Sequence, residues 1–355
     1  MKRFLLLTVC LGSCLVSCST RVHNTTGTHE AVEAVAATAR ARNVILMIGD
    51  GMGSEHVWAA WMANHGKLNI TGLPVTGFIV TTSASHAVTD SAAGGTAIAC
   101  GCKTKNGQLG ITADGESVDS LAVQMRRAGK ATGLVVTKAV TDATPAAFYA
   151  HVKSRKDTPA IAEALVRAGF DVVVGGGSAA FSAGQLQTLE EKSRLLELAA
   201  AGDCEPASKR GDWLPTRVEK ALSVLEKDQD GFFLMVEGSK IDMSSHVNDM
   251  EETVRETLDF DQAVGVVLRW MKKHPDTLLV VTADHQTGGL TLHGGDKDKG
   301  EVKGRFSTFS HSGVSVPVYA AGAGAGAFVG VQDNTGLAPK IRQAAGLHTR
   351  ARTAQ

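Results

Sequence analysis

A short apolar run at residues 44–48, followed at once by Gly-Asp-Gly, constrains the fold of this chain more than any other stretch. The run is too short for a helix, and its lack of polar alternation is typical of a strand buried on both faces, as in a parallel sheet. Asp50 stands where this strand would end, and open α/β sheets bind their ligands beyond the carboxyl ends of strands. A carboxylate delivered there by a rigid strand is a good first ligand for a cation.

Two other interpretations of this stretch are local. A dinucleotide-binding loop needs Gly-x-Gly-x-x-Gly, but Ser54 occupies the sixth place after Gly49 and Gly51. No acidic residue stands about 20 positions further on, where ribose recognition would need one. Alternatively, Asp50 only caps the next helix. Other candidate ligands elsewhere in the chain would favour a role for Asp50 in binding a cation over a role as a helix cap.

Apolar and amphipathic segments alternate along the rest of the chain. Strands are predicted over 77–82, 132–137, 171–174, 232–236, 278–283 and 316–321, and helices over 121–127 and 161–168. A turn at 142–145 is expected to lead into a helix carrying His151 and Arg155, the glycines 175–177 to form a loop, and 178–210 to be helix-prone. The alternation predicts an α/β fold, with a large central, mostly parallel sheet flanked by helices on both faces.

The composition is that of an ordinary globular protein. Of the 355 residues, 43% are hydrophobic and 20% are charged, which leaves ample material for a core. The 36 acidic and 36 basic residues balance each other. We therefore expect no electrostatic binding to nucleic acid or to a membrane face.

The amino terminus has the features of a targeting signal. Lys2 and Arg3 precede an apolar stretch that is too short to span a bilayer, so residues 1–17 are predicted to be a signal peptide. Leu-Val-Ser-Cys at 15–18 resembles a bacterial lipobox, which would leave Cys18 as a lipidated first residue; ordinary cleavage between 17 and 20 is the alternative. Residues 18–40 would then be a tether, and 41–355 a single domain. The expectation is an exported protein of the periplasm or outer membrane, anchored through Cys18.

Removal of the signal peptide and lipidation of Cys18 would leave three cysteines, Cys100, Cys102 and Cys204. An odd number leaves at least one thiol unpaired. Cys100 and Cys102 are too close in sequence for an easy bridge to each other, so a disulfide from Cys204 to one of them is possible. A C-x-C pair alone is a weak zinc signature.

Acidic side chains follow three of the predicted strands. Asp50, Glu237 and the pair Asp284–His285 each come at the end of an apolar run. Charged groups at the ends of buried strands are rarely left unpaired in a core that serves only stability. Since the carboxyl ends of parallel strands share one edge of the sheet, these side chains are expected to meet there.

Further candidates come from helices and loops. Asp242 and His246 are spaced i, i+4, which places both on one helix face, although most such pairs are solvated surface pairs. His311 is a lone histidine, more often structural than a ligand. Ser91 begins a run of small residues at a predicted helix start, where free N–H groups attract an anion. Mixed Asp and His ligands suit zinc, and oxygen ligands suit magnesium. Together they predict a multi-metal site with Ser91 at its centre.

At this point the chain resembles the alkaline phosphatase family. The matching segments occur in the family's order and cover nearly everything from residue 42 to about 347: 48–53, 89–93, 142–145, 154–155, 236–242, 282–285 and 311–313. The resemblance implies a three-layer α/β sandwich formed by a single catalytic domain over 41–355. It also implies hydrolysis of phosphomonoesters to an alcohol and inorganic phosphate, through a phosphoserine formed on Ser91.

Carried over residue by residue, the resemblance implies two zinc ions and one magnesium ion. One zinc ion would bind Asp242, His246 and His311, and the other Asp50, Asp284 and His285, with Ser91 as an exchangeable ligand. The magnesium ion would share Asp50 and bind Glu237, Thr144 and, through water, Asp142. Arg155, steadied by Asp90, would hold two phosphate oxygens as a bidentate fork.

Two departures from the family and two rival functions remain. Met243 follows Asp242 where relatives commonly place Lys or His, which reduces the positive charge near phosphate. Segments 178–213 and 287–309 are short where loops often build dimer contacts, so a homodimer is possible rather than expected. A phosphodiesterase or sulfatase of the same superfamily is the main alternative, disfavoured by Arg155 and by the absence of a Cys-x-Pro-x-Arg motif around Ser91. A non-catalytic lipoprotein that binds phosphate or metal is the other.

Overall fold

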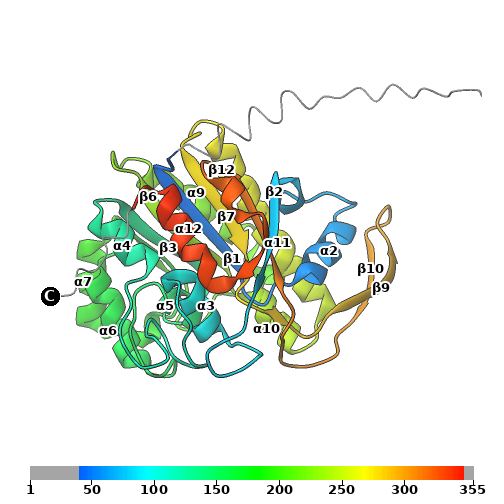
Figure 1. The fold of residues 1–355 in the computed structure, drawn as a ribbon, viewed down its shortest axis with the longest axis horizontal. Coiled ribbons are helices and arrows are strands. Elements are labelled where there is room, and N and C mark those ends of the chain that lie inside the picture. The colour runs from blue at the N-terminus through cyan, green and yellow to red at the C-terminus, as the bar shows by residue number, and fades with distance from the viewer. Residues whose placement is uncertain (1–39, 348–355) are drawn as a thin grey trace, which may run out of the picture.

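The computed structural model describes residues 40–347. Within them, the main sheet has nine strands in the order β13-β2-β12-β7-β1-β6-β3-β4-β5 (Figure 1). Its strands are β1 (Asn43–Gly49), β2 (Val75–Val80), β3 (Ala131–Ala139), β4 (Val172–Gly176), β5 (Leu195–Leu198), β6 (Phe232–Gly238), β7 (Thr277–Thr282), β12 (Val316–Gly322) and β13 (Gly330–Asp333). Two small ribbons pair β9 (Thr291–Asp296) with β10 (Glu301–Arg305) and β8 (Gln286–Thr287) with β11 (His311–Ser312).

The strand β1 lies at the centre of this sheet and pairs in parallel with β6 and β7. Every residue of β1, β6 and β7 is buried, as expected for apolar runs without polar alternation. Only β12 runs against its neighbours, β7 and β2. The prediction of a large, mostly parallel sheet is confirmed.

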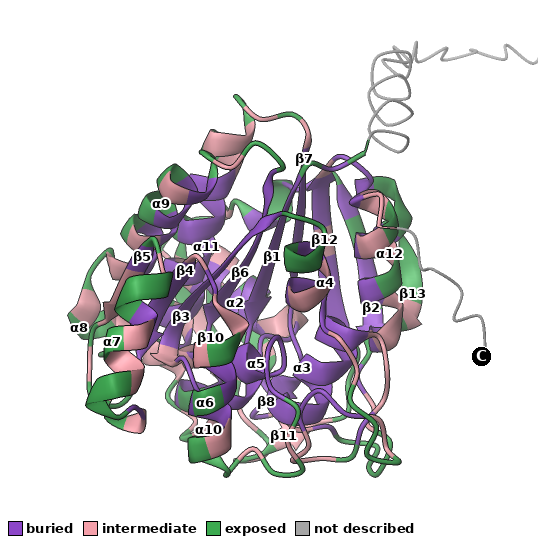
Figure 2. Cartoon of the chain, turned by 90° about the vertical axis from the view of Figure 1, so that its left-hand side faces the viewer, coloured by how far each residue is buried: buried purple, intermediate pink, exposed green. Residues whose placement is uncertain are grey.

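Helices cover both faces of the sheet (Figure 2). On one side, α9 (Trp213–Leu225) and α11 (Met250–Met271) pack on each other and on the central strands, with α2 (Ser54–Ala63) beside α11. On the other side lie α3 (Ser91–Cys100), α4 (Leu121–Arg127) and α12 (Leu337–Ala344). The remaining helices are α5 (Ala143–Ala146), α6 (Thr158–Ala168), α7 (Ala183–Lys192), α8 (Ala207–Arg210) and α10 (Lys240–His246), with short 3-10 turns at Ile70–Gly72, Ser178–Ala180, Ala325–Phe328 and Asn334–Gly336.

The helix expected to carry His151 and Arg155 is a wrong prediction. After the short α5 the chain continues as a loop, and α6 begins only at Thr158. Val152 is held by backbone hydrogen bonds to Leu109, and the Arg155 N–H donates to the Gly107 carbonyl at 2.7 Å. These long-range bonds use the backbone groups that a helix would need, so tertiary contacts override the local helix propensity.

Two smaller corrections concern the third quarter of the chain. Gly175 and Gly176 belong to β4 rather than to a loop, and Gly177 is the residue that turns, with a φ of 91°. The helix-prone segment 178–210 also contains the edge strand β5. A Cβ on Gly176 would lie 2.2 Å from the Gly202 carbonyl, so the glycine permits a close crossing of two chain segments.

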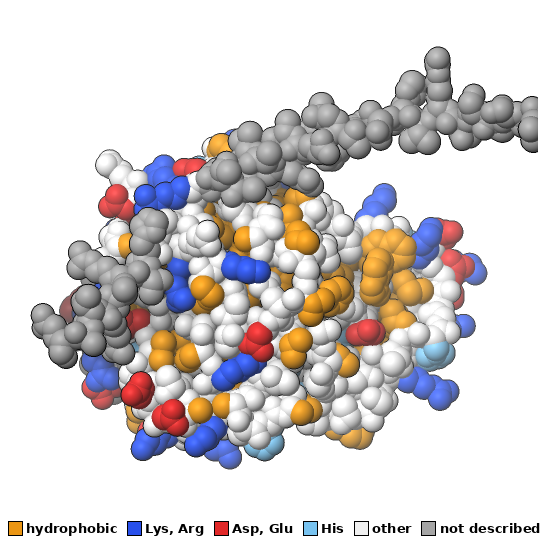
Figure 3. All heavy atoms as spheres, viewed as in Figure 1, with side chains coloured by type: hydrophobic (Ala, Val, Ile, Leu, Met, Phe, Trp, Pro, Cys, Tyr) orange, Lys and Arg blue, Asp and Glu red, His pale blue; other side chains and the backbone are white. Residues whose placement is uncertain are grey.

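The possible disulfide from Cys204 is absent from the described structure, in which all three cysteines are free thiols. Cys100 and Cys204 are buried, and Cys102 is partly buried. The predicted signal peptide, the Cys18 anchor and nearly all of the tether lie outside the described residues. Within the described part of the chain, no helix combines the length and the apolar character needed to cross a membrane. Charges of both signs are interspersed on the face seen in Figure 3.

Candidate metal centre and nucleophile

The ends of the three central strands deliver the acidic groups. Ile48 of β1 pairs with Glu237 of β6 on one side and with Thr282 of β7 on the other. Asp50 and Asp284 therefore follow two adjacent strands at the same edge of the sheet, with Glu237 on the third. All three carboxylates are buried. The backbone at Gly51, which has a φ of 71°, donates its N–H to Asp284 Oδ1 at 3.2 Å and so links two of these strand ends.

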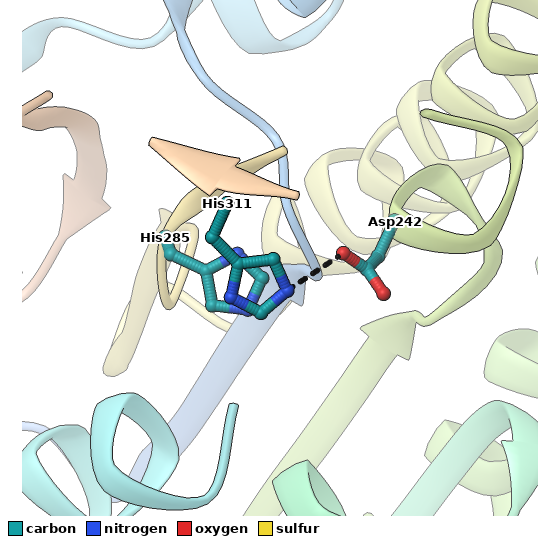
Figure 4. Close-up of side chains that lie close together, drawn as sticks. All are labelled: Asp242, His285 and His311. Carbon is teal, nitrogen blue, oxygen red and sulfur yellow. Dashed lines mark ion pairs between the residues drawn. The ribbon is translucent and has the colours of Figure 1, made fainter. Parts of the chain in front are cut away.

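Asp242, His246 and His311 form the first group. Asp242 Oδ1 lies 3.3 Å from His246 Nε2 and 3.5 Å from His311 Nε2, and the two Nε2 atoms are 3.2 Å apart. Figure 4 shows Asp242 on α10 facing His311 on β11, whose ring stacks on that of His285 with centroids 3.6 Å apart. The predicted helical pair therefore does meet the distant histidine.

The hydrogen bonds of these two histidines determine which ring nitrogen carries the proton. His246 Nδ1–H donates to the Phe309 carbonyl at 2.7 Å, and His311 Nδ1–H donates to the Thr89 carbonyl at 2.9 Å. In the neutral rings, both Nε2 lone pairs then point toward each other and toward the Asp242 carboxylate. Backbone carbonyls on Nδ1 are the usual means of orienting metal-binding imidazoles. Such a convergence of electron-rich atoms suits a bound cation.

The second group is another set of possible metal ligands: Asp50, Asp284 and His285. His285 Nε2 lies 3.4 Å from Asp50 Oδ1 and 3.2 Å from Asp284 Oδ2. Ser91 Oγ, at the first residue of α3, is 3.2 Å from the same nitrogen. One ligand atom each from Asp50, Asp284 and His285 falls within 4.8 Å of the others, and the same holds for Asp242, His285 and His311. His285 therefore lies between the two groups.

Thr287 connects the two groups, and no sequence pattern singled it out. Its hydroxyl donates to Asp242 Oδ1, because a carboxylate can only accept. The same oxygen lies 3.2 Å from His285 Nδ1 and so accepts the Nδ1–H, leaving the His285 Nε2 lone pair free to face the cluster. Its only signal was its place two residues after His285. A Cβ on Gly51 would lie 2.6 Å from the Thr287 hydroxyl, which explains the glycine there.

Several buried carboxylate oxygens in this cluster have no hydrogen-bond partner: Asp50 Oδ1, Asp284 Oδ2 and both oxygens of Glu237. Burial raises the pKa of Asp284 to about 7 and that of Glu237 to about 8, and it raises the pKa of Asp50 well above its usual value, in each case with a smaller contribution from neighbouring carboxylates. Buried charges are normally paired or bound to metals. The residues therefore fit divalent cations.

Thr144 and Asp142, which the resemblance assigns to magnesium, lie at the start of α5. The Thr144 hydroxyl donates to Asp50 Oδ2 at 3.2 Å. Together with the unpartnered oxygens of Glu237, these groups form an oxygen-rich region on the far side of Asp50, the donor type that magnesium prefers. Asp142 accepts hydrogen bonds from Arg155 Nη2 at 3.5 Å and from Lys138 Nζ at 2.6 Å.

Arg155 lies on a loop and is linked to the start of α3, where Ser91 is, through Asp90. Its Nη1 is 3.4 Å from Asp90 Oδ2, and Asp90 Oδ1 accepts the Ala93 N–H as the cap of α3. Asp90 therefore binds both the helix that begins with Ser91 and the predicted phosphate-binding guanidinium. Ser91 opens α3, where N–H groups and the helix dipole favour an anion. The small residues after Ser91 allow close packing: a Cβ on Gly94 would be 2.9 Å from the Asp284 carbonyl.

Comparison with known proteins identifies the family. The alkaline phosphatase family model matches residues 41–194 and 185–303. The chain is 35% identical to alkaline phosphatase 4 of Bacillus subtilis, and the match covers 72% of the present chain. It is 31% identical to the alkaline phosphatase of Escherichia coli, and that match covers 86% of each of the two chains. It spans about 63% of the length of the Bacillus protein.

Solved structures agree with the sequence comparison. The alkaline phosphatase of the Antarctic bacterium TAB5 superimposes with a TM-score of 0.83 at 32% identity, over 88% of this chain and 100% of that one. A mutant of the TAB5 enzyme, described with Mg bound in its M3 site, matches with the same TM-score at 33% identity over the same shares of the two chains. The family resemblance of the sequence motifs is thereby confirmed: the chain belongs to the alkaline phosphatase family.

Proposed function

We propose that the protein is a metal-dependent phosphatase that hydrolyses phosphomonoesters to an alcohol and inorganic phosphate through a phosphoserine on Ser91. One observation carries the proposal above the others. Ser91 Oγ lies at the N-terminus of α3 and 3.2 Å from Nε2 of His285, a residue that belongs to both clusters of candidate metal ligands. A hydroxyl placed among cation ligands at a helix N-terminus suits attack on a phosphate ester.

We propose two zinc ions and one magnesium ion as cofactors. Asp242, His246 and His311 would hold one zinc ion, and Asp50, Asp284 and His285 the other. Glu237, Thr144 and Asp50 would hold magnesium, with Asp142 acting through water. When bound, such ions lower the pKa of a nearby hydroxyl and neutralise charge that develops on oxygen.

The side chains then divide the reaction between them. Ser91 Oγ gives up its proton and forms a bond to phosphorus, as the ester oxygen leaves with its electron pair and takes up a proton to become the alcohol. Arg155, oriented by Asp90 and Asp142, holds two of the phosphate oxygens near the start of α3. Water then attacks the phosphoserine, the bond from phosphorus to Ser91 Oγ breaks, and inorganic phosphate leaves. The groups act only on phosphate, which supports a broad range of phosphomonoesters.

The test compares three substrates of the purified mature protein: p-nitrophenyl phosphate, bis(p-nitrophenyl) phosphate and p-nitrophenyl sulfate. We expect the monoester to be turned over fastest, the activity to disappear on chelation, and its return to need both zinc and magnesium. Metal analysis before and after chelation identifies the ions. A preference for the diester or the sulfate would replace this proposal with another activity of the superfamily.

Export and lipid anchoring at Cys18, and formation of a homodimer, are separate proposals that rest on the sequence alone. Mass spectrometry of the mature amino terminus tests the anchor: a diacylglyceryl group on Cys18 is expected, whereas an unmodified start between 17 and 20 would contradict it. Fractionation into periplasm and outer membrane tests the location. Sedimentation of the mature protein gives the oligomeric state.

A further inference from the structure

A partly buried lysine, Lys138, lies beside Asp142, and the proposed reaction does not use it. Its side chain is only 13% exposed, and its Nζ lies 2.6 Å from Asp142 Oδ2. A lysine in this position loses most of its hydration, so its surroundings must offer charge in return. In the sequence it was one polar residue at the end of a predicted strand, with nothing to mark it.

Lys138 begins a row of alternating charges that ends at the nucleophile helix. Asp142 binds Lys138 through Oδ2 and Arg155 through Oδ1, and Arg155 binds Asp90 through Nη1. Asp90 in turn caps α3, whose first residue is Ser91. Asp142 therefore pairs with two positively charged side chains. Its bond to Arg155 is 3.5 Å long, and its bond to Lys138 is shorter, at 2.6 Å.

The backbone around Lys138 is fixed from both sides. The Thr137 hydroxyl accepts the Ser239 N–H at 2.9 Å, and the Ala139 N–H donates to Asp203 Oδ1 at 3.0 Å. The pairing of β3 with β4 changes register between Val135 and Ala139, and such irregularities commonly re-aim a side chain next to an active site. Lys138 is thus directed at Asp142 by the fold rather than by its own flexible stem.

The charges around Lys138 belong to the region assigned to the third cation. Burial alone would lower the pKa of Lys138, but Asp142 and then Asp50 outweigh it and raise that pKa, so the ammonium stays charged. The Lys138 Nζ lies 2.6 Å from Oδ2 of Asp142, one of the groups proposed to hold magnesium. A positive group is therefore already present among the carboxylates proposed to hold magnesium.

We propose that Lys138 is a positioning residue that keeps the bond from Asp142 to Arg155 the longer and weaker of the two, and at the same time weakens the binding of the third cation. This inference rests on the proposed function. By binding Asp142 tightly, Lys138 reduces the hold of Asp142 on the Arg155 guanidinium, which can then take phosphate more readily. By adding a positive charge next to Asp142, it opposes a divalent cation in the same region.

Replacement of Lys138 by methionine keeps the length of the side chain and removes its charge. In the zinc-loaded K138M protein, we expect Mg²⁺ to bind roughly tenfold more tightly by calorimetry, because one opposing charge is gone. We also expect inorganic phosphate to inhibit several-fold more weakly and KM to rise more than kcat falls, because Asp142 then draws on Arg155 alone. The K138R variant keeps the positive charge, so it should keep the wild-type Mg²⁺ affinity and the wild-type inhibition by phosphate.

Lys130 provides the matched control, since it flanks the other end of β3 and is also buried, with its Nζ bonded to the carbonyls of Arg42 and Asp230. K130M should lose stability without changing Mg²⁺ or phosphate affinity. Equal or weaker Mg²⁺ binding by K138M, with an active wild-type enzyme, would overturn the role of Lys138 alone. A wild-type protein that binds no Mg²⁺ and hydrolyses no phosphomonoester would overturn the proposed function as well.

Discussion

Ser91 is the residue whose removal should separate catalysis from structure. Its Oγ contacts His285 Nε2, but the cap of α3 is supplied by Asp90 and the cluster is held by other side chains. For Ser91→Ala we therefore predict a loss of at least about 10³-fold in turnover of p-nitrophenyl phosphate, with metal content and Tm close to wild type. Turnover within about tenfold of wild type would show that another group attacks phosphorus.

Asp50 should have the opposite profile, because it belongs to the second group of ligands and also faces the oxygen-rich region around Thr144. Its Oδ1 lies 3.4 Å from His285 Nε2, and its Oδ2 accepts the Thr144 hydroxyl. We predict that Asp50→Asn loses more than one metal equivalent per chain, measured by elemental analysis after dialysis, since an amide removes a negative charge that two cations would share. Asp276→Asn is the control, because the Asp276 side chain is 41% exposed and pairs with Arg42. Full metal occupancy in Asp50→Asn would rule out a bridging role.

At the scale of elements, α3 and α6 allow a matched comparison of two helix caps. Asp90 caps α3 by accepting the Ala93 N–H, and Asp157 caps α6 by accepting the Ala160 N–H. Only Asp90 also binds Arg155. Loss of the cap should cost about 1 kcal/mol of stability in each helix, and Asp90→Ala also removes the acceptor of the Gly107 N–H.

The catalytic effects of these two changes should differ. We predict that Asp90→Ala raises KM several-fold while Asp157→Ala leaves KM unchanged, although thermal denaturation should show a lower Tm for both variants. Equal KM values in the two variants would remove Asp90 from phosphate binding and leave it as a helix cap only.

The elements also show where the sequence was and was not informative. The strands that carry Asp50, Glu237 and Asp284 were predictable, because an unbroken apolar run has few alternatives to a buried parallel strand. The loop around Arg155 was not, since its helix-compatible residues are held by backbone bonds to Gly107 and Leu109, far away in sequence. Arg155 itself was found only through the family motif, which does not depend on secondary structure.

For the whole molecule, the positions named from the sequence converge, but two of their supports were invisible. Lys138 and Thr287 act through Asp142, Asp242 and His285, and such contacts between distant segments leave no periodicity or spacing to read. Residue types at strand ends indicated a cation site. How the histidines are oriented depends on carbonyl groups, which every residue carries, so no sequence pattern could identify them.

The assembled cluster should make the stability of the whole protein depend on metal and pH together. Burial raises the pKa of Asp284 to about 7 and of Glu237 to about 8, and raises that of Asp50 as well. The hydrogen bond to Asp242 raises the pKa of His246. All of these groups hold protons more firmly in the folded chain than in the unfolded one, so stability falls as the pH rises through the folded values.

We therefore predict that the Tm of the chelated protein decreases between about pH 6 and pH 9, because the buried carboxyl groups must ionise without a partner. Bound cations pair with the ionised carboxylates, so the metal-loaded protein should lose much less over the same range and the gap between the two should widen with pH. Glu237→Gln removes one of these titrations and should flatten the curve of the chelated protein alone. Parallel curves for the chelated and metal-loaded proteins would mean that the cation ligands are not the groups that titrate, and that the carboxylates at the strand ends are held by something other than metal.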